Sequence, residues 1–224
     1  MLIKYLKDIP IFNHLNESHL KEIALRCRSV SFKKGDVVFH MTSPSTDLYV
    51  VLQGKLKAER IDEEGAEIVL SHFEQGDFFG ELSLIDAKGR SATIVAEEAS
   101  ELAILRRDVF LELLLKDSKI AVELIVTLAD RLRKADEMIE SLAFLAVGER
   151  LLKSLIEIGR HEGKAEKGFI RVSKLTHKDL ASRIGASREA VSKCMKTFAS
   201  KGIIKESEGY ILISDDISDK GLMV

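Results

Sequence analysis

Short apolar runs separated by turn residues dominate the chain between residues 30 and 105. The runs fall at residues 37–40, 48–52, 55–61, 67–73 and 91–96, and glycines stand at several of the turns between them. Strands at such close spacing predict an antiparallel barrel or sandwich. Residues 6–27 before it and 107–115 after it have the period of helices, and we expect them to pack at its ends.

From residue 121 onward the apolar positions recur in alternating steps of four and three. They are Ala121, Ile125, Leu128, Leu132, Ala135, Ile139, Leu142 and Ala146. A period of this kind over several heptads is typical of a coiled coil, and it predicts a parallel homodimer through residues 121–146. The alternative is an amphipathic helix lying on its own domain, although such a helix usually has a broader apolar stripe. A twofold axis along the paired helices presents two copies of whatever follows them.

The heptad period stops after residue 144. Residues 145–150 contain Gly148, and a new amphipathic helix is predicted from about residue 149 to 161. Because glycine is the least restricted residue, Gly148 is the expected hinge between the long helix and the C-terminal segment.

Residues 175–193 have the pattern of a helix-turn-helix. Thr176 is expected to cap the first helix with Asp179 in the capping-box position, Gly185 to make the turn, and Ser187 to cap the second helix. The apolar positions predicted to form the core between the two helices are Leu180, Ala181, Ile184, Val191, Met195 and Phe198.

The charge distribution sets this segment apart from the rest of the chain. Residues 174–205 carry eight basic and two acidic side chains, a net charge of +6, whereas the whole chain has −2 and the remainder therefore −8. Such a basic end indicates a polyanionic partner. Residues 203–205 and 210–213, around Gly209, predict a two-stranded wing after the second helix.

Side chains at the start of the second helix have the chemistry of base readout. Arg188 can donate two hydrogen bonds to guanine O6 and N7, and Glu189 can accept one from cytosine N4. The alternative is a set of ordinary solvated charges, but an acid within a basic element does not suit nonspecific phosphate binding. We predict double-stranded DNA as a partner, contacted by Thr176, Ser187, Arg188, Glu189, Ser192 and Lys193.

A second candidate site lies at residues 77–96. Glu81 can accept a hydrogen bond from a ribose hydroxyl, and the fork of Arg90 matches two phosphate oxygens. Gly80 lets backbone amides approach an anion, and Ser91 adds a hydroxyl beside the arginine. The alternative for Glu81 and Arg90 is a partly exposed structural ion pair.

Residues 77–96 closely resemble the phosphate-binding cassette of cyclic-nucleotide-binding domains. They are most similar to those of the cyclic-AMP receptor family, the CRP/FNR superfamily of bacterial transcription regulators, and the resemblance extends from about residue 8 to 213. It implies that Glu81 holds the ribose and that Arg90 with Ser91 holds the cyclic phosphate. The ligand candidates are Gly80, Glu81, Leu82, Ser83, Arg90, Ser91, Arg131, Ala135 and Asp136.

The resemblance also implies an α+β fold in three parts. They are an N-terminal antiparallel β-roll that binds the nucleotide (residues 1–117), a long coiled-coil dimerisation helix with its hinge (118–146), and a C-terminal winged helix-turn-helix (147–224). In this family the long helix lies over the nucleotide, so residues near Ala135 and Asp136 face the base across the dimer. Arg131, at a family-like position, pairs with Glu81 or lies near the phosphate.

The sequence leaves two candidates for the base of the cyclic nucleotide, adenine and guanine. Many cyclic-AMP responders have threonine and serine where this chain has Ala135 and Asp136. An ionised Asp136 only accepts hydrogen bonds, and guanine offers two adjacent donors where adenine offers one amine. Cyclic AMP is the first expectation and cyclic GMP the second, while Asp136 as a solvated flank residue is the structural alternative.

The resemblance extends to the output of the regulator. It places Arg188, Glu189 and Lys193 at base-reading positions and implies half-sites similar to TGTGA, with Lys193 standing where an arginine is usual. It also implies contact with RNA polymerase. Family members commonly have a capping aspartate where Ala146 stands, so the geometry of the hinge is expected to differ here.

Other classes of function fit the chain less well. The two cysteines, Cys27 and Cys194, lie 167 positions apart without a CxxC motif, and the histidines are scattered, so we expect no metal site and no cofactor beyond the effector nucleotide. No activated nucleophile accompanies Glu81, so we expect no enzyme. With no long apolar stretch, the chain is expected to be cytoplasmic and off the membrane. The main alternative is the same architecture with another effector, or with none.

Overall fold

The computed structural model describes residues 2–216. The chain divides into two compact units, one formed by residues up to 60 with residues 70–134, and the other by residues 61–69 with those from 135 onward. Residue 1 and residues 217–224, which end the predicted N- and C-terminal domains, lie outside the described residues.

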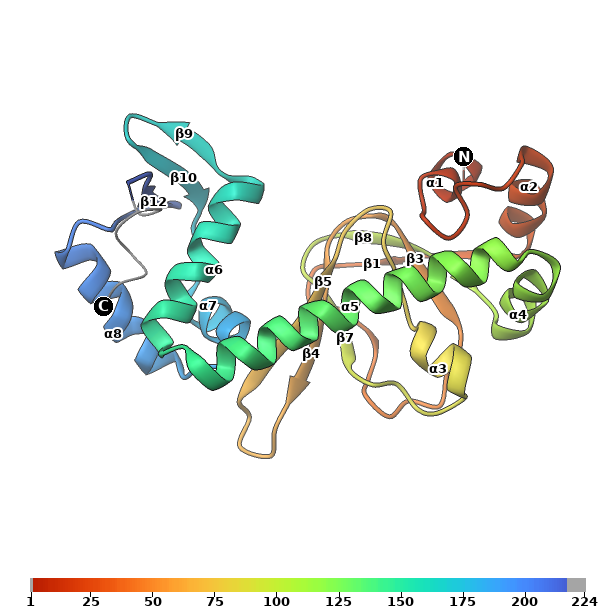
Figure 1. Ribbon diagram of the computed structural model, residues 1–224, viewed down its shortest axis with the longest axis horizontal. Coiled ribbons are helices and arrows are strands. Elements are labelled where there is room, and N and C mark those ends of the chain that lie inside the picture. The colour runs from red at the N-terminus through yellow and green to blue at the C-terminus, as the bar shows by residue number, and fades with distance from the viewer. Residues whose placement is uncertain (1, 217–224) are drawn as a thin grey trace. The chain divides into compact units, whose positions relative to one another are not determined.

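The N-terminal part is an antiparallel β structure with helices at its ends (Figure 1). Its elements are α1 (Leu2–Lys7), α2 (Glu17–Arg26), β1 (Arg28–Phe32), β2 (Val37–Phe39), β3 (Leu48–Gln53), β4 (Leu56–Ile61), β5 (Glu67–Phe73), β6 (Phe78–Phe79), α3 (Glu81–Asp86), β7 (Thr93–Ala96), β8 (Ser100–Leu105) and α4 (Arg107–Lys116). The strands form two sheets, in the orders β1-β8-β3-β6 and β2-β7-β4-β5. The five predicted strands are confirmed, and β1, β6 and β8 are additional.

The helical pattern predicted for residues 6–27 is confirmed only in part. Two helices, α1 and α2, are separated by a series of turns that contains Pro10. Asn16 starts α2 by accepting a hydrogen bond from the His19 N–H (2.9 Å). Phe12 is fully buried within the turns, so apolar residues that suggested a helix there serve the core from a non-helical segment.

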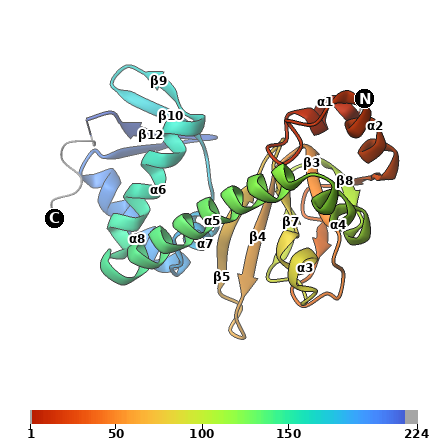
Figure 2. The same ribbon diagram turned by 45° about the vertical axis from the view of Figure 1, so that its right-hand side comes forward.

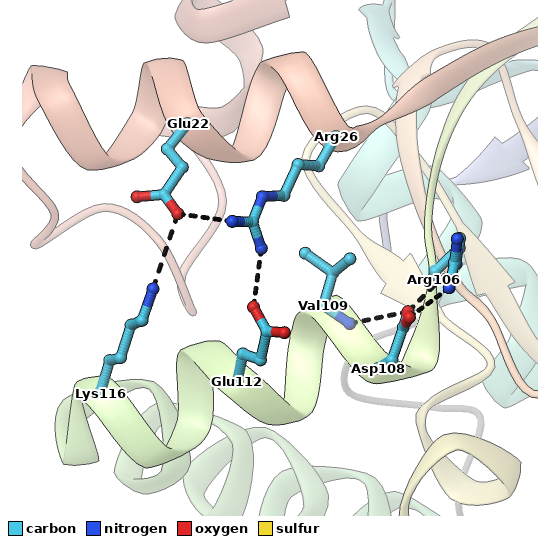
Figure 3. Close-up of polar contacts among 7 residues, drawn as sticks. All are labelled: Glu22, Arg26, Arg106, Asp108, Val109, Glu112 and Lys116. Atoms are coloured by element: carbon cyan, nitrogen blue, oxygen red, sulfur yellow. Dashed lines mark hydrogen bonds and ion pairs between the residues drawn. The ribbon is translucent and has the colours of Figure 1, made fainter.

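Ion pairs on the surface link α2 to α4. Figure 3 shows Arg26 of α2 reaching Glu22 on its own helix (3.0 Å) and Glu112 on α4 (2.7 Å), while Lys116 of α4 approaches Glu22 (3.6 Å). These exposed pairs contribute little to stability. The apolar contact beneath them, which includes Phe110 of α4, carries more of the packing energy because its side chains are fully buried.

The long helix α5 (Ser118–Phe144) follows, and the next helix is α6 (Val147–Glu162). The predicted seam is therefore one position too long, because Ala146 is the N-cap of α6 and not part of α5. The Ala146 N–H donates to Oε2 of Glu149 (2.7 Å), but the methyl side chain cannot accept in return, so only half of a capping box exists. The predicted hinge is also displaced: Gly148 lies inside α6, and a Cβ there would be 3.8 Å from Sγ of Cys194.

One arginine links this break to the C-terminal helices. Arg150 donates from Nη1 to the carbonyl of Leu145 (2.8 Å), from Nε to that of Ile184 (3.0 Å) and from Nη2 to that of Gly185 (3.3 Å). These carbonyls lie where helices end, where the helix itself leaves them without a partner.

The C-terminal unit is a helix-turn-helix packed on a small sheet. Its elements after α6 are β9 (Lys164–Glu166), β10 (Phe169–Ser173), α7 (His177–Ile184), α8 (Arg188–Ser200), β11 (Ile204–Ser207) and β12 (Tyr210–Ser214). The sheet order is β11-β12-β10-β9, so the predicted two-stranded wing is part of a four-stranded sheet. Figure 2 shows α6 alongside this sheet, whose inner face and the three helices enclose one core.

We predict that two glycine substitutions separate backbone strain from steric conflict. Gly54 and Gly65 both have positive φ, +98° and +83°. A Cβ at Gly54 would lie 2.6 Å from Cα of Ser100 and 2.7 Å from the carbonyl oxygen of Ala99, whereas Gly65 has open space. Gly65→Ala should cost about 1 kcal/mol and Gly54→Ala more than about 3 kcal/mol in unfolding free energy, measured by denaturant titration. Equal losses would contradict this difference.

Candidate functional site

Strand β6 and helix α3 meet at Gly80. Together with Ser45, Asp47 and Ser83, this glycine forms a small cradle around the side chain of Arg90. Gly80 has a φ of +88°, in the left-handed region. A Cβ at this position would lie 2.5 Å from Nη1 of Arg90 and 2.8 Å from the carbonyl oxygen of Asp47. Only glycine therefore permits the close approach of the arginine to the backbone.

The guanidinium of Arg90 fills the cradle, and the residue is only 2% exposed. Its donors reach the carbonyl of Gly80 (2.9 Å), the hydroxyl of Ser83 (2.8 Å), the carbonyl of Asp47 (2.8 Å) and the hydroxyl of Ser45 (3.0 Å). All four acceptors are neutral oxygens. The buried charge is hydrogen-bonded, but among residues 2–216 no carboxylate accepts a hydrogen bond from it, which is an unfavourable condition for an ion away from water.

Aromatic rings line one side of this guanidinium. Its Cζ atom lies 4.2 Å from the centre of the Phe39 ring and 5.3 Å from that of Tyr49, within the range of cation–π attraction. Desolvation by burial lowers the pKa of Arg90, and the fields of Tyr49, Asp47 and Glu81 oppose this shift. The cradle therefore holds a desolvated cation in a fixed position.

Glu81 is the first residue of α3 and is 3% exposed. Its Oε1 lies 2.7 Å from Nη1 of Arg131, which belongs to α5, and Nη2 of Arg131 donates to the carbonyl of Phe78 (2.5 Å). Of the two positions predicted for Arg131, the structure shows pairing with Glu81. The predicted ribose acceptor is thus engaged by a side chain of the long helix.

The other ligand candidates lie in different surroundings. Ser83 is buried and supports Arg90, while Leu82 is exposed on α3. Ser91 is also exposed, and its carbonyl accepts from Nε of Arg60 (3.0 Å). Ala135 and Asp136 are exposed residues of α5 that belong to the second unit.

Further residues, which were not predicted from the sequence, hold Arg90 from the other side. Ser45, Asp47 and the two aromatic rings lie more than forty positions earlier in the chain, at residues 39–49. The Arg90 N–H donates to the carbonyl of Ser43 (3.2 Å), and the Arg90 carbonyl accepts from Thr42 (2.9 Å). No motif spacing connects these segments to Arg90. Only the pairing of β2 with β7 brings them together.

The helix-turn-helix has the predicted caps. The Asp179 N–H donates to Oγ1 of Thr176 (3.1 Å) and the Thr176 N–H donates to Oδ2 of Asp179 (3.0 Å), which is a full capping box. Gly185 ends α7 with a φ of +59°, and the Ala190 N–H donates to Oγ of Ser187 (3.2 Å). The predicted core positions are confirmed, with Phe198 partly buried beside the rest.

The exposed side of α8 forms a shallow hollow. It is lined by Arg188, Glu189, Ser192, Lys193 and Lys196. The structure thus brings together the four candidates from α8 and adds Lys196, which lies one turn beyond Ser192 and which helical spacing could have indicated. The Ser192 hydroxyl is already engaged, since it donates to the carbonyl of Arg188 (2.8 Å).

Among residues 2–216, no group of three or more His, Cys, Asp or Glu is placed to hold a metal ion, and no helix has the length and apolar character needed to span a bilayer. Cys27 is a free thiol whose pKa is raised to about 11 by burial, which makes it a poor nucleophile.

Comparison with known proteins assigns both units. Residues 29–117 match the family model for a cyclic nucleotide-binding domain, and residues 149–216 match that for a Crp-like helix-turn-helix domain. A protein of Mycobacterium tuberculosis named CRP-like cAMP-activated global transcriptional regulator is 31% identical over 206 residues, or 92% of each chain. The chain belongs to the CRP/FNR family of transcription regulators. Members of this family are regulators and not enzymes, which confirms the predicted class.

Solved structures of the CRP/FNR family have the same architecture. A CRP/FNR-family transcriptional regulator from Thermus thermophilus is 30% identical, with a TM-score of 0.69, over 84% of this chain and 94% of that one. The global regulator CLP of Xanthomonas campestris, at 22% identity, has a TM-score of 0.79 over 89% of this chain and 99% of its own. The α+β fold with a β-roll, a long helix and a C-terminal helix-turn-helix is therefore confirmed.

We predict that loss of Arg131 destabilises the first unit. Arg131→Ala leaves the buried Glu81 carboxylate without its ion partner, which should cost about 2 kcal/mol because Arg131 itself is 29% exposed. The matched control is Arg133→Ala, two residues later, where the pair with Asp130 is largely exposed and the cost should stay below about 0.5 kcal/mol. Denaturant titration at neutral pH measures both, and equal effects would show that the Glu81 pair has no special weight.

Proposed function

We propose that this CRP/FNR-family chain is a homodimeric transcription regulator whose DNA binding is controlled by a cyclic mononucleotide. The observation that carries the proposal is the buried guanidinium of Arg90, whose hydrogen-bond acceptors are all neutral. A cyclic phosphate carries one negative charge, which would balance the positive charge of the arginine. Bidentate or charge-assisted contact with phosphate is the strongest interaction available to a guanidinium.

The ribose is assigned to Glu81, and Ser91 is assigned to the phosphate beside Arg90. The carboxylate of Glu81 is buried and forms its ion pair with Arg131, so a sugar hydroxyl has to share or replace that contact. Because Arg131 lies on α5, ligand binding then acts directly on the long helix. The proposed ligand set also contains Gly80, Leu82 and Ser83 from the same turn, with Ala135 and Asp136 at the base.

For the base, cyclic AMP is proposed first. The M. tuberculosis relative is named as cAMP-activated, which supports adenine in a chain that is 31% identical to it. Cyclic GMP is the alternative, because Asp136 has only acceptors to offer when ionised and guanine offers two adjacent donors.

A different effector, or none, is the second candidate function. The observation in its favour is that CLP, which shares this fold, is described as responsive to c-di-GMP. The uncharged acceptors of Arg90 favour an anionic effector over none, since a bound anion would balance the charge of the guanidinium.

The partner along α5 is proposed to be a second copy of the chain. Three apolar residues spaced by heptads, Ile125, Leu132 and Ile139, are 63–64% exposed in the single chain. A coiled-coil seam with a second α5 would bury them. The twofold axis then pairs the two α8 helices, which suits half-sites about 34 Å apart on DNA.

Proposed DNA recognition rests on the exposed start of α8. Arg188 and Glu189 are assigned to guanine and cytosine of a TGTGA-like half-site, with Lys193 in place of the usual arginine. Thr176, Ser187 and Ser192 are assigned to the same interface. RNA polymerase is the proposed target of the assembled complex, in the cytoplasm, and domain limits of 1–117, 118–146 and 147–224 are proposed for the functional parts.

The ligand prediction is tested by titrating a symmetric duplex with two TGTGA-like half-sites at fixed salt, followed by fluorescence anisotropy. The protein alone is compared with the protein plus cyclic AMP and the protein plus cyclic GMP. The cognate nucleotide should raise the affinity about tenfold or more. Arg90→Ala should abolish this response because the phosphate loses its counter-charge, whereas Arg28→Ala, an exposed arginine of β1, should keep it.

Two results would contradict the ligand proposal. Equal DNA binding under all three conditions would remove nucleotide control while leaving DNA binding intact. A full response in Arg90→Ala would show that the ligand binds elsewhere.

The base-readout prediction concerns Glu189. Glu189→Ala should lower the ratio of specific to nonspecific affinity about tenfold, because one base contact is lost while the phosphate contacts stay. Glu208→Ala, an exposed acid in the wing turn, is the control for the change in charge. The measurement is competition between the duplex and variants with each half-site base replaced. An unchanged base preference would exclude readout by Glu189.

A further inference from the structure

One histidine at the start of α7 contacts both α8, the proposed recognition helix, and β11 of the wing. His177 is the first residue of α7. Its Nδ1 lies 2.8 Å from Oγ of Ser192 on α8, and its Nε2 lies 3.9 Å from Oε1 of Glu206 on β11. The imidazole is partly buried at the meeting point of the three elements.

The direction of the hydrogen bonds follows from the Ser192 hydroxyl. A hydroxyl has a single hydrogen and two acceptor lone pairs. Oγ of Ser192 lies 2.8 Å from the carbonyl oxygen of Arg188, where it can only donate. It therefore accepts from Nδ1–H of His177. The result is a chain of two hydrogen bonds that starts on α7 and ends on the backbone of Arg188.

This chain of hydrogen bonds reaches the turn of α8 that carries the candidate base readers. The buried residues Val191 and Met195 hold the core side of α8. Apolar packing is not directional, so it leaves small shifts of the exposed side open, whereas a hydrogen bond fixes distance and angle. Base contacts require placement to about half an ångström, which the residues behind the contacting ones must supply.

We propose that His177 is a positioning residue for base readout, which holds the first turn of α8 in register through Ser192. The inference rests on the proposed recognition of DNA by α8 and adds a residue that touches no base. Its signature is a loss of specificity without a loss of general DNA affinity, because phosphate contacts do not depend on the fine placement of Arg188 and Glu189.

The experiment compares a specific and a scrambled duplex by fluorescence anisotropy at fixed salt, in the presence of saturating nucleotide. His177→Ala should weaken specific binding about tenfold and change binding to the scrambled duplex less than about twofold. His177→Asn, whose side-chain N–H can take the place of Nδ1–H, should recover specific binding to within about threefold of the unsubstituted protein. His161→Ala, at the exposed end of α6, is the matched control.

A double-mutant cycle isolates the hydrogen bond to Ser192. If His177 acts through that hydroxyl, then Ser192→Ala should weaken specific binding, and the variant with both substitutions should lose no more than the worse of the two single variants. Thermal unfolding of each variant monitors the fold. Should His177→Ala fail to fold, Ser192→Ala and His177→Asn carry the same comparison.

The outcomes are separable. If the unsubstituted protein binds both duplexes equally, the proposed DNA recognition fails, and the inference fails with it. If the unsubstituted protein discriminates but His177→Ala keeps the same ratio, or the two substitutions add fully, the positioning role is overturned while the proposed function stands.

Discussion

The hydrogen bonds from the Arg90 guanidinium to four uncharged oxygens set the condition on which the N-terminal unit depends. Water cannot reach the charge, so the backbone has to supply carbonyls at fixed positions, and this accounts for a left-handed glycine at position 80. The same requirement draws residues 45–47 against the β6–α3 junction. The β6–α3 junction and the segment at residues 45–47 are thus arranged around a buried cation that is held by uncharged oxygens.

This cradle is not isolated from the long helix. The ion pair between Glu81 and Arg131 joins the turn that holds Arg90 to α5, which has exposed apolar residues at heptad spacing. Any group that competes for Glu81 therefore changes the contacts of the long helix. Free energy of binding can pass between the two only through such a difference in contacts between states.

The sequence was sufficient where a function depends on local periodicity or a contiguous motif. The capped helices around Gly185 and the long helix α5 each lie within a short window, and the structure has them. It was insufficient where a role depends on pairing between distant segments. Ser45 and Asp47 reach Arg90 only because β2 lies beside β7, and β9 escaped notice because its three residues are all exposed. The helical pattern over residues 6–27 was right for α2 but not for the turns before it, since a turn can bury apolar side chains as well as a helix does.

The end of α5 has a mechanical consequence. Arg150 donates to the carbonyl of Leu145, directly after α5. It also donates to the carbonyls of Ile184 and Gly185, at the corner between α7 and α8. The two-residue linker at 145–146 is thus bridged by a side chain, which restricts its flexibility. The corner between α7 and α8 therefore takes its orientation from the end of α5. One residue inserted in α5 would turn this corner by about 100° around the helix axis, whatever its effect on the length of the helix.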